Sequence, residues 1–179
     1  TRWGLSSNVE FLLNGRGVYE NYRATSFSTI GDRRDGWRTA VESGFKFRPT
    51  DWQTFTLTGG YANKDANSVG FSYDEARIDL QSLTLFDGGR YLSLSGTFKN
   101  TEYDAPDNFY SNTTAREDDF WRVRAAVGAP METIFRGANF ELPDSVADIV
   151  AQVGVTYSRQ DSNISNLDID NWSTDIMFT

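Results

Sequence analysis

Apolar and polar residues alternate with a period of two in segment after segment of this 179-residue chain. Such alternation puts apolar side chains on one side of a β-strand and polar ones on the other. The first segment runs from Leu5 to Glu20, with Phe11 on the apolar side and Arg16 on the polar side. The pattern recurs in residues 37–48, 54–61, 76–86, 91–99, 121–128, 149–158 and 172–178. No helical periodicity of useful length competes with it. The sequence therefore predicts an all-β fold with about eight strands.

The segments between the strands alternate in length. Short turns at Pro49-Thr50-Asp51 and Asp87-Gly88-Gly89 contrast with long connections rich in Asn, Asp, Ser and Gly. The long connections are residues 23–36, 62–74, 102–119 and 159–171. This order predicts one antiparallel up-and-down domain over residues 1–179, with a tight end and an elaborate end. Residues 131–148 are too long for a tight turn and predict a short helix or a plug-like loop.

The composition excludes several kinds of function. The chain has no Cys and no His, which removes disulfides, thiolate and imidazole metal sites and His-dependent nucleophilic catalysis. A net charge of -8 argues against nucleic acid as a partner. The densest acidic groups, Glu117-Asp118-Asp119 and Asp168-Ile169-Asp170, fall in expected loops, where acidic clusters are usually only solvated. The groups Asp104/Asp107/Asn108 and Asp168/Asp170/Asn171 lack the spacing of a dedicated calcium loop. We therefore expect no enzymatic activity, no cofactor and no metal.

The chain combines few hydrophobic residues, 39%, with many aromatic residues, 15%. A transmembrane barrel explains this combination, because only every second wall residue faces lipid and aromatic rings gather at the two membrane interfaces. A soluble two-sheet sandwich also alternates, but its strands are usually nearer 5–6 residues. The predicted interface aromatics are Tyr19, Trp37, Phe47, Tyr61, Phe86, Trp121, Tyr157, Trp172 and Phe178.

Charged residues of both signs lie in the middle of the polar sides. They are Glu10, Arg16, Arg38, Glu42, Lys46, Arg77, Asp79, Arg122 and Arg124, and we expect them to face the lumen. In a closed eight-stranded barrel the arginines would pair with Glu10, Glu42 and Asp79 and fill the interior. In a larger or incomplete barrel the same residues would line a passage.

Several stretches resemble the barrel of the surface lipoprotein assembly modifier family. Residues 155–173 resemble its penultimate hairpin, with Arg159, Ser162, Asn163 and Ile164 matching the loop motif and Ser165 in place of a proline. Upstream, residues 73–77, 93–99 and 103–107 resemble the same barrel, so the likeness extends over about the last 110 residues. Proteins of that family carry helical repeats and a larger barrel, whereas no helical repeat is present here. The chain is then either a C-terminal portion of such a protein or a smaller relative.

The resemblance implies a bacterial outer-membrane protein that exports or displays proteins at the cell surface. Its expected partners are outer-membrane lipid, a lipoprotein or other protein client, and other envelope proteins. Two alternatives stay open at this point: a small structural, adhesion or porin-like outer-membrane barrel, and a soluble secreted β-sandwich that binds a ligand.

Overall fold

A computed structural model describes residues 1–22, 30–107, 111–136, 143, 146 and 149–179. The described residues form one antiparallel sheet of nine strands, ordered β1 to β9 as in the sequence. The strands are β1 Arg2–Ser6, β2 Val9–Glu20, β3 Gly36–Thr50, β4 Gln53–Ala66, β5 Tyr73–Leu85, β6 Tyr91–Tyr103, β7 Glu117–Pro130, β8 Val150–Ser162 and β9 Ile169–Phe178. The all-β, antiparallel, up-and-down prediction is confirmed. Because the described strands form a single sheet, they do not make the two-sheet sandwich.

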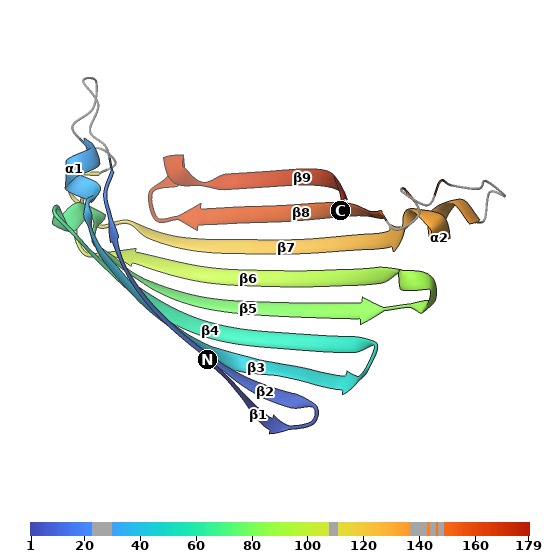
Figure 1. Cartoon of the computed structure of the whole chain (residues 1–179). Coiled ribbons are helices and arrows are strands. Elements are labelled where there is room, and N and C mark those ends of the chain that lie inside the picture. Colours follow the sequence, from blue (N-terminus) through green and yellow to red (C-terminus); the bar gives the residue numbers. More distant parts are fainter. Residues whose placement is uncertain (23–29, 108–110, 137–142, 144–145, 147–148) are drawn as a thin grey trace.

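The sheet is strongly curved, and β1 and β9 are its two edges (Figure 1). The eight segments with alternating residues correspond to β2–β9, and β1 is an additional strand. The prediction of one continuous strand from Leu5 was wrong, because a turn at Ser7 and Asn8 folds β1 back onto β2. The register also shifts between Gly4 and Ser6. Beyond this shift, Trp3 lies directly opposite Phe11, so both odd-numbered rings share one face and the alternation does not reveal the turn.

The connections lie at two opposite ends of the sheet (Figure 1). The turn end holds the turns 7–8 and 51–52, the one-turn helix η2 Asp87–Gly89 and the helix α2 Met131–Arg136. Gly88 and Gly89 have φ angles of +74° and +73°, a region open to glycine without strain. The expected short helix after β7 is confirmed as α2. The segments 137–142, 144–145 and 147–148 of the expected plug-like loop lie outside the described residues.

The loop end holds α1 Ile30–Arg34, η1 Val69–Phe71, the connection 104–116 and η3 Ser165–Leu167. Three of these connections are joined to one another. Arg33 forms an ion pair with Asp107 at 3.3 Å, and the backbone N–H of Asn67 donates to the Asp35 carbonyl at 2.7 Å. The connections 67–72 and 163–168 are shorter than predicted, because the strands extend into the polar segments. Glu117-Asp118-Asp119 and Asp170 accordingly lie in strands and not in loops.

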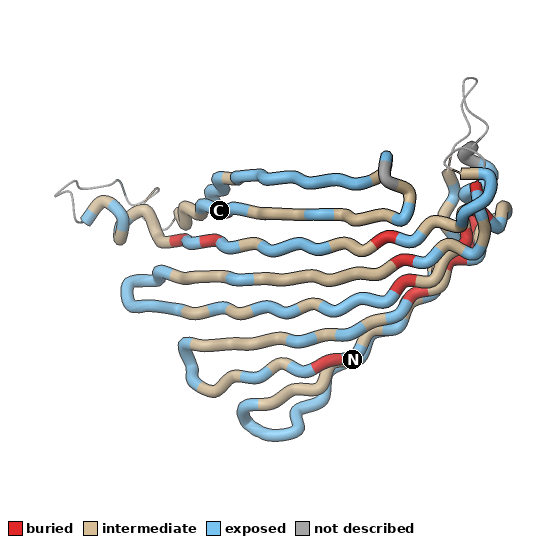
Figure 2. The backbone as a smooth tube through the Cα atoms, turned by 180° about the vertical axis from the view of Figure 1, so that it is seen from behind, coloured by how far each residue is buried: buried red, intermediate tan, exposed pale blue. Residues whose placement is uncertain are grey.

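Burial in this sheet is the reverse of that in a water-soluble domain. Among the described residues, the buried apolar side chains are only Ala62 and Ala126, whereas many large apolar ones are exposed. Many of the buried residues collect toward the loop end across neighbouring strands, and a second small group lies on β7 near the turn end (Figure 2). The buried polar or charged residues are Asp35, Lys64, Ser72, Glu75, Thr101, Asp107 and Asp118.

Candidate functional site

The strand register divides the side chains into two faces of opposite character. Arg38 of β3 and Glu75 of β5 meet at 3.2 Å across the strand between them, on the side where a curved sheet brings next-nearest strands closer together. We call this side the concave face. A β-carbon added at Gly60, on the same face of β4, would lie 2.9 Å from Glu42. A β-carbon at Gly96, on the opposite convex face, would have nothing within 4 Å.

The convex face is apolar, with rings toward both ends of the strands. At the loop end, Tyr19 packs against Trp37 with ring centroids 5.6 Å apart, and Tyr157 packs against Trp172 at 4.7 Å. At the turn end, Phe11 packs against Phe45 at 5.4 Å. Exposed aliphatic side chains lie between the two groups of rings, among them Val41, Leu57, Ile78, Leu80, Leu94, Val123, Val153 and Ile176.

The sequence-predicted aromatics divide between these two ends. Tyr19, Trp37, Tyr61, Trp121, Tyr157 and Trp172 lie on the convex face toward the loop end. Phe47 and Phe178 lie on that face at the turn end, and Phe86 directly follows β5 there. Their role at a membrane interface stays a prediction. Sequence reasoning left Trp3, Phe11, Phe45 and Phe98 out of this set, although each shares the parity of the chosen rings.

Beyond the loop-end rings the convex face becomes acidic. Asp74 lies directly opposite Glu102, and Glu102 lies directly opposite Glu117. Like charges in directly opposed positions destabilise a sheet unless water screens them. The apolar band of the convex face therefore ends at the rings, and the outer ends of the strands are suited to water.

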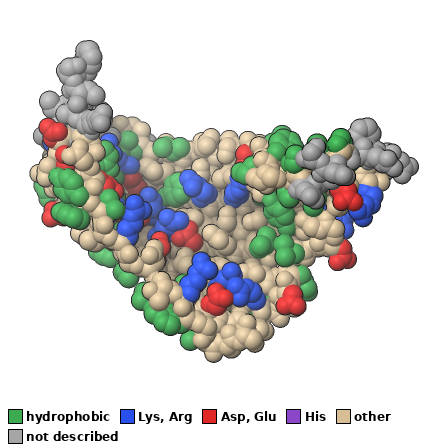
Figure 3. All heavy atoms as spheres, viewed as in Figure 1, with side chains coloured by type: hydrophobic (Ala, Val, Ile, Leu, Met, Phe, Trp, Pro, Cys, Tyr) green, Lys and Arg blue, Asp and Glu red, His purple; other side chains and the backbone are tan. Residues whose placement is uncertain are grey.

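All nine charged residues predicted to face a lumen lie on the concave face. The register brings Glu10, Arg16, Arg38, Glu42, Lys46, Arg77, Asp79, Arg122 and Arg124 to one side of the sheet. Figure 3 looks onto this hollowed side, where basic and acidic side chains gather over the middle strands. Whether that side encloses a lumen stays a prediction.

In this nine-stranded sheet the charges mostly pair otherwise than expected for a closed eight-stranded barrel. Arg77 and Asp79 do pair, with Nε–Oδ2 at 2.6 Å and Nη2–Oδ1 at 2.8 Å, because positions two apart share a face. The other ion pairs of this set cross strands to partners outside the predicted set. Arg38 pairs with Glu75, Arg124 with Asp175, and Glu10 with Arg48. Arg124 reaches Asp175 over Gly154, whose missing side chain leaves room for the guanidinium.

Sequence reasoning missed the charged cluster at the loop end of the concave face. The Lys64 side chain is only 4% exposed, and its Nζ lies 2.8 Å from Glu20 Oε2 and 3.3 Å from the Tyr22 hydroxyl. Glu75 is shared between Arg38 and Lys99. Lys64 lies in the predicted connection 62–74, and Glu75 lies just before the predicted strand 76–86. At these strand ends polar residues on both faces hide the alternation. Extending the hairpin register past residues 61 and 76 would have found them.

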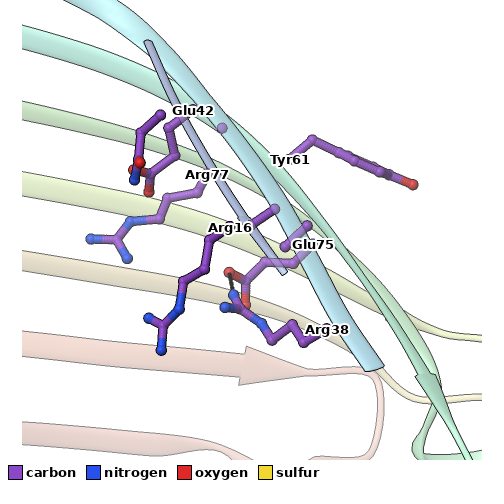
Figure 4. Close-up of a pocket in the computed structure, with 10 residues that line it drawn as sticks. Arg16, Arg38, Glu42, Tyr61, Glu75 and Arg77 are labelled. Atoms are coloured by element: carbon purple, nitrogen blue, oxygen red, sulfur yellow. Dashed lines mark hydrogen bonds and ion pairs between the residues drawn. The ribbon is translucent and has the colours of Figure 1, made fainter. Parts of the chain in front are cut away.

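Three neighbouring hollows that share lining residues follow the concave face. One hollow, about 440 Å³, lies midway along the strands between Arg77 and Arg122, and we call it the middle hollow. Its other lining side chains are mostly hydroxyls and amides. Arg77 also lines a second hollow of about 200 Å³ with Arg16, Arg38, Glu42 and Glu75 (Figure 4). In that view the labelled charged side chains lie on one side of the strands, whereas Tyr61 points away from them.

The third hollow, about 210 Å³, lies at the loop end and shares Glu75 with the second. Lys64, Lys99, Arg34 and Arg116 line it together with five aromatic rings. Thr101 also lines it, with a buried hydroxyl that has no hydrogen-bond partner among the described residues. The three hollows together form a polar track along the concave face.

The described residues hold no cluster of three or more metal-ligating side chains. Within the same residues, no helix has the length and apolar character needed to cross a membrane. The site can thus offer charge, hydrogen bonds and rings to a ligand.

A protein-family model described as surface lipoprotein assembly modifier matches residues 2–131. The match includes the motifs at 73–77, 93–99 and 103–107, and it ends before the hairpin at 155–173. It also begins far earlier than the expected last 110 residues, so β1–β4 are part of the family likeness. No curated protein and no solved structure matches the chain.

Proposed function

Because the chain belongs to the surface lipoprotein assembly modifier family, we propose that its sheet forms part of the wall of an outer-membrane barrel that assembles surface lipoproteins. In this proposal the convex face contacts outer-membrane lipid and the concave face contacts the lipoprotein. The protein carries out no enzymatic reaction and needs no cofactor.

The observation that carries the proposal is the reversed burial. Many large apolar residues on the convex face are about half exposed, such as Val123 at 57% and Leu80 at 53%, while Lys64 and Glu75 on the concave face are buried. In a soluble monomer an apolar surface of this extent would promote association, whereas in a membrane it is covered by lipid hydrocarbon chains. A polar interior with an apolar exterior is the arrangement of transmembrane barrels.

The dimensions support the same proposal. On β2, nine residues from Phe11 to Tyr19 connect the turn-end rings with the loop-end rings. A tilted transmembrane strand needs about 9–11 residues. The acidic pairs Asp74–Glu102 and Glu102–Glu117 then lie outside the hydrocarbon, in water at the membrane surface.

The concave face supports a polypeptide client over a small solute. The track consists of neighbouring hollows with charges of both signs, hydroxyls and amides, and it is not one closed pocket. A translocating chain presents a backbone donor and acceptor at every residue, and such a surface can hydrogen-bond to it at many positions.

The test is to delete the gene in its host and to measure lipoproteins at the cell surface and in the whole cell. The proposal expects lipoproteins to be lost from intact cells, by antibody labelling or protease shaving, with unchanged amounts in lysates. Unchanged surface labelling, or an equal loss in the lysate, would refute the role. Complementation with the intact gene is the control for effects on neighbouring genes.

A further inference from the structure

The charge of the concave face is opposite in sign to that of the chain. The whole chain carries -8, with 17 basic and 25 acidic residues. The strands place ten basic and seven acidic residues on the concave face, so the excess there is basic. The basic ones are Arg2, Arg16, Arg38, Lys46, Arg48, Lys64, Arg77, Lys99, Arg122 and Arg124, and the acidic ones are Glu10, Glu20, Glu42, Glu75, Asp79, Asp118 and Asp175.

The excess is sharper once internal ion pairs are set aside. Lys64, Arg77 and Arg124 each have a carboxylate partner. Within the described part of the chain, Arg16 and Arg122 have none, and the Arg122 guanidinium lies over the Phe120 ring at 5.1 Å. Arg34 of α1 lies over the loop-end hollow without a carboxylate contact among the same residues. Its guanidinium stacks on the Tyr22 ring at 4.5 Å.

These three arginines are distributed along the track. Arg122 lines the middle hollow, Arg16 the hollow of Figure 4, and Arg34 the loop-end hollow. The loop-end hollow also contains the unpartnered hydroxyl of Thr101, which is 5% exposed. A buried hydroxyl without a partner costs free energy that a ligand can recover by forming a hydrogen bond with it.

We propose that the track binds an acidic segment of the lipoprotein client in an extended conformation, with Arg16, Arg34 and Arg122 contacting its carboxylates. This inference rests on the proposed function, since it assumes that a polypeptide lies along the concave face. Guanidinium groups bind carboxylates through two parallel hydrogen bonds, which gives more specificity than a point charge. Acids of the track such as Asp79 and Glu75 are already paired with cations, so they repel an acidic segment only weakly. A basic segment would instead be repelled by the three unpaired arginines.

The experiment measures binding of a fluorescent, unstructured peptide of alternating Glu and Ser to the full chain in detergent micelles, by anisotropy. A peptide with Lys in place of Glu is the matched comparison, and inorganic phosphate is the competitor. We expect the Glu peptide to bind at least tenfold more tightly than the Lys peptide, with binding that weakens as salt is raised. Phosphate should compete only at far higher concentration. Equal binding of the two peptides, or competition by phosphate at peptide-like concentration, would overturn the proposal.

The variants locate the site. The triple variant Arg16→Gln, Arg34→Gln, Arg122→Gln should bind the Glu peptide at least tenfold more weakly. The control triple Arg90→Gln, Arg136→Gln, Arg159→Gln removes the same charge outside the concave face and should bind as the native chain does. An equal loss in both triples would show that net charge alone matters and would refute the assignment. The peptide comparison on the native chain stands even where a variant does not fold.

The two proposals fail in different ways. If surface display depends on the gene but the Glu peptide binds no better than the Lys peptide, only the acidic-client inference is wrong. If display is unaffected by deletion, the proposed function is wrong whatever the peptides do.

Discussion

Adjacent residues Leu80 and Gln81 in the middle of β5 allow the facing of the sheet to be tested directly. Leu80 lies on the convex face opposite Leu57 and Gly96, and Gln81 lies on the concave face opposite Thr56 and Ser95. Both side chains are exposed. In a water-soluble sheet, arginine at either position would therefore be tolerated about equally.

A bilayer separates the two positions. Leu80 lies four residues past Ala76, the register partner of the ring-bearing Tyr61, and six before Phe86. It is thus close to the middle of the apolar band. An arginine facing lipid at the bilayer midplane costs about 2–4 kcal/mol. The Leu80→Arg change should lower the ratio of folded to unfolded protein by roughly 30- to 700-fold, at about 1.4 kcal/mol per tenfold. Arginine at Gln81 meets the polar middle hollow and should change the free energy of unfolding by about 0.5 kcal/mol or less.

The assay is urea titration of each full-length variant folded in lipid vesicles, followed by tryptophan fluorescence and by the heat-dependent gel mobility of folded barrels. The free energy of unfolding is compared at a common urea slope. Equal free energies for Leu80→Arg and Gln81→Arg would refute the assignment of the convex face to lipid. A larger loss for Gln81→Arg would reverse it.

Three further outcomes follow from particular contacts. Gly128→Ala should destabilise the sheet by about 1–3 kcal/mol, because the new β-carbon would clash with the Tyr91 ring. The clash would also displace the Tyr91 hydroxyl, which donates to Gln152 at 2.6 Å. Gly96→Ala, which places its β-carbon in open space, should be neutral in the same urea titration. Glu20→Gln should lower the free energy of unfolding by about 1–3 kcal/mol, because it leaves the buried Lys64 ammonium without its carboxylate. The double variant Glu20→Gln, Lys64→Met should recover part of that free energy. No recovery in the double variant would argue against the pair. In a variant with Trp3 and Trp52 replaced by Phe, lipids brominated near the headgroup should quench the fluorescence of the three remaining tryptophans, Trp37, Trp121 and Trp172. Lipids brominated at the chain terminus should quench it less. The opposite order would contradict the interface position of these rings.

The sequence predicted the strands best where one face is apolar. The alternation around Val123 and Leu80 marks β7 and β5, because apolar residues there alternate with polar residues along the strand. It fails at the strand ends near Asp74 and Glu102, where both faces are polar and a strand cannot be distinguished from a loop. The charged residues of the concave face follow from parity alone. Their partners do not, because pairs such as Arg38–Glu75 depend on the curvature of the sheet and skip a strand.

The pairing of each strand with its sequence neighbours has a consequence for how the protein forms. Every strand in the order β1 to β9 pairs only with the strand before it and the strand after it. Hairpins such as β3–β4 and β5–β6 close over very short connections, so the chain entropy lost in forming each pair is small. Assembly can then proceed by adding one hairpin at a time to a growing edge. The one long connection on the turn end, between β7 and β8, is where this progression should slow.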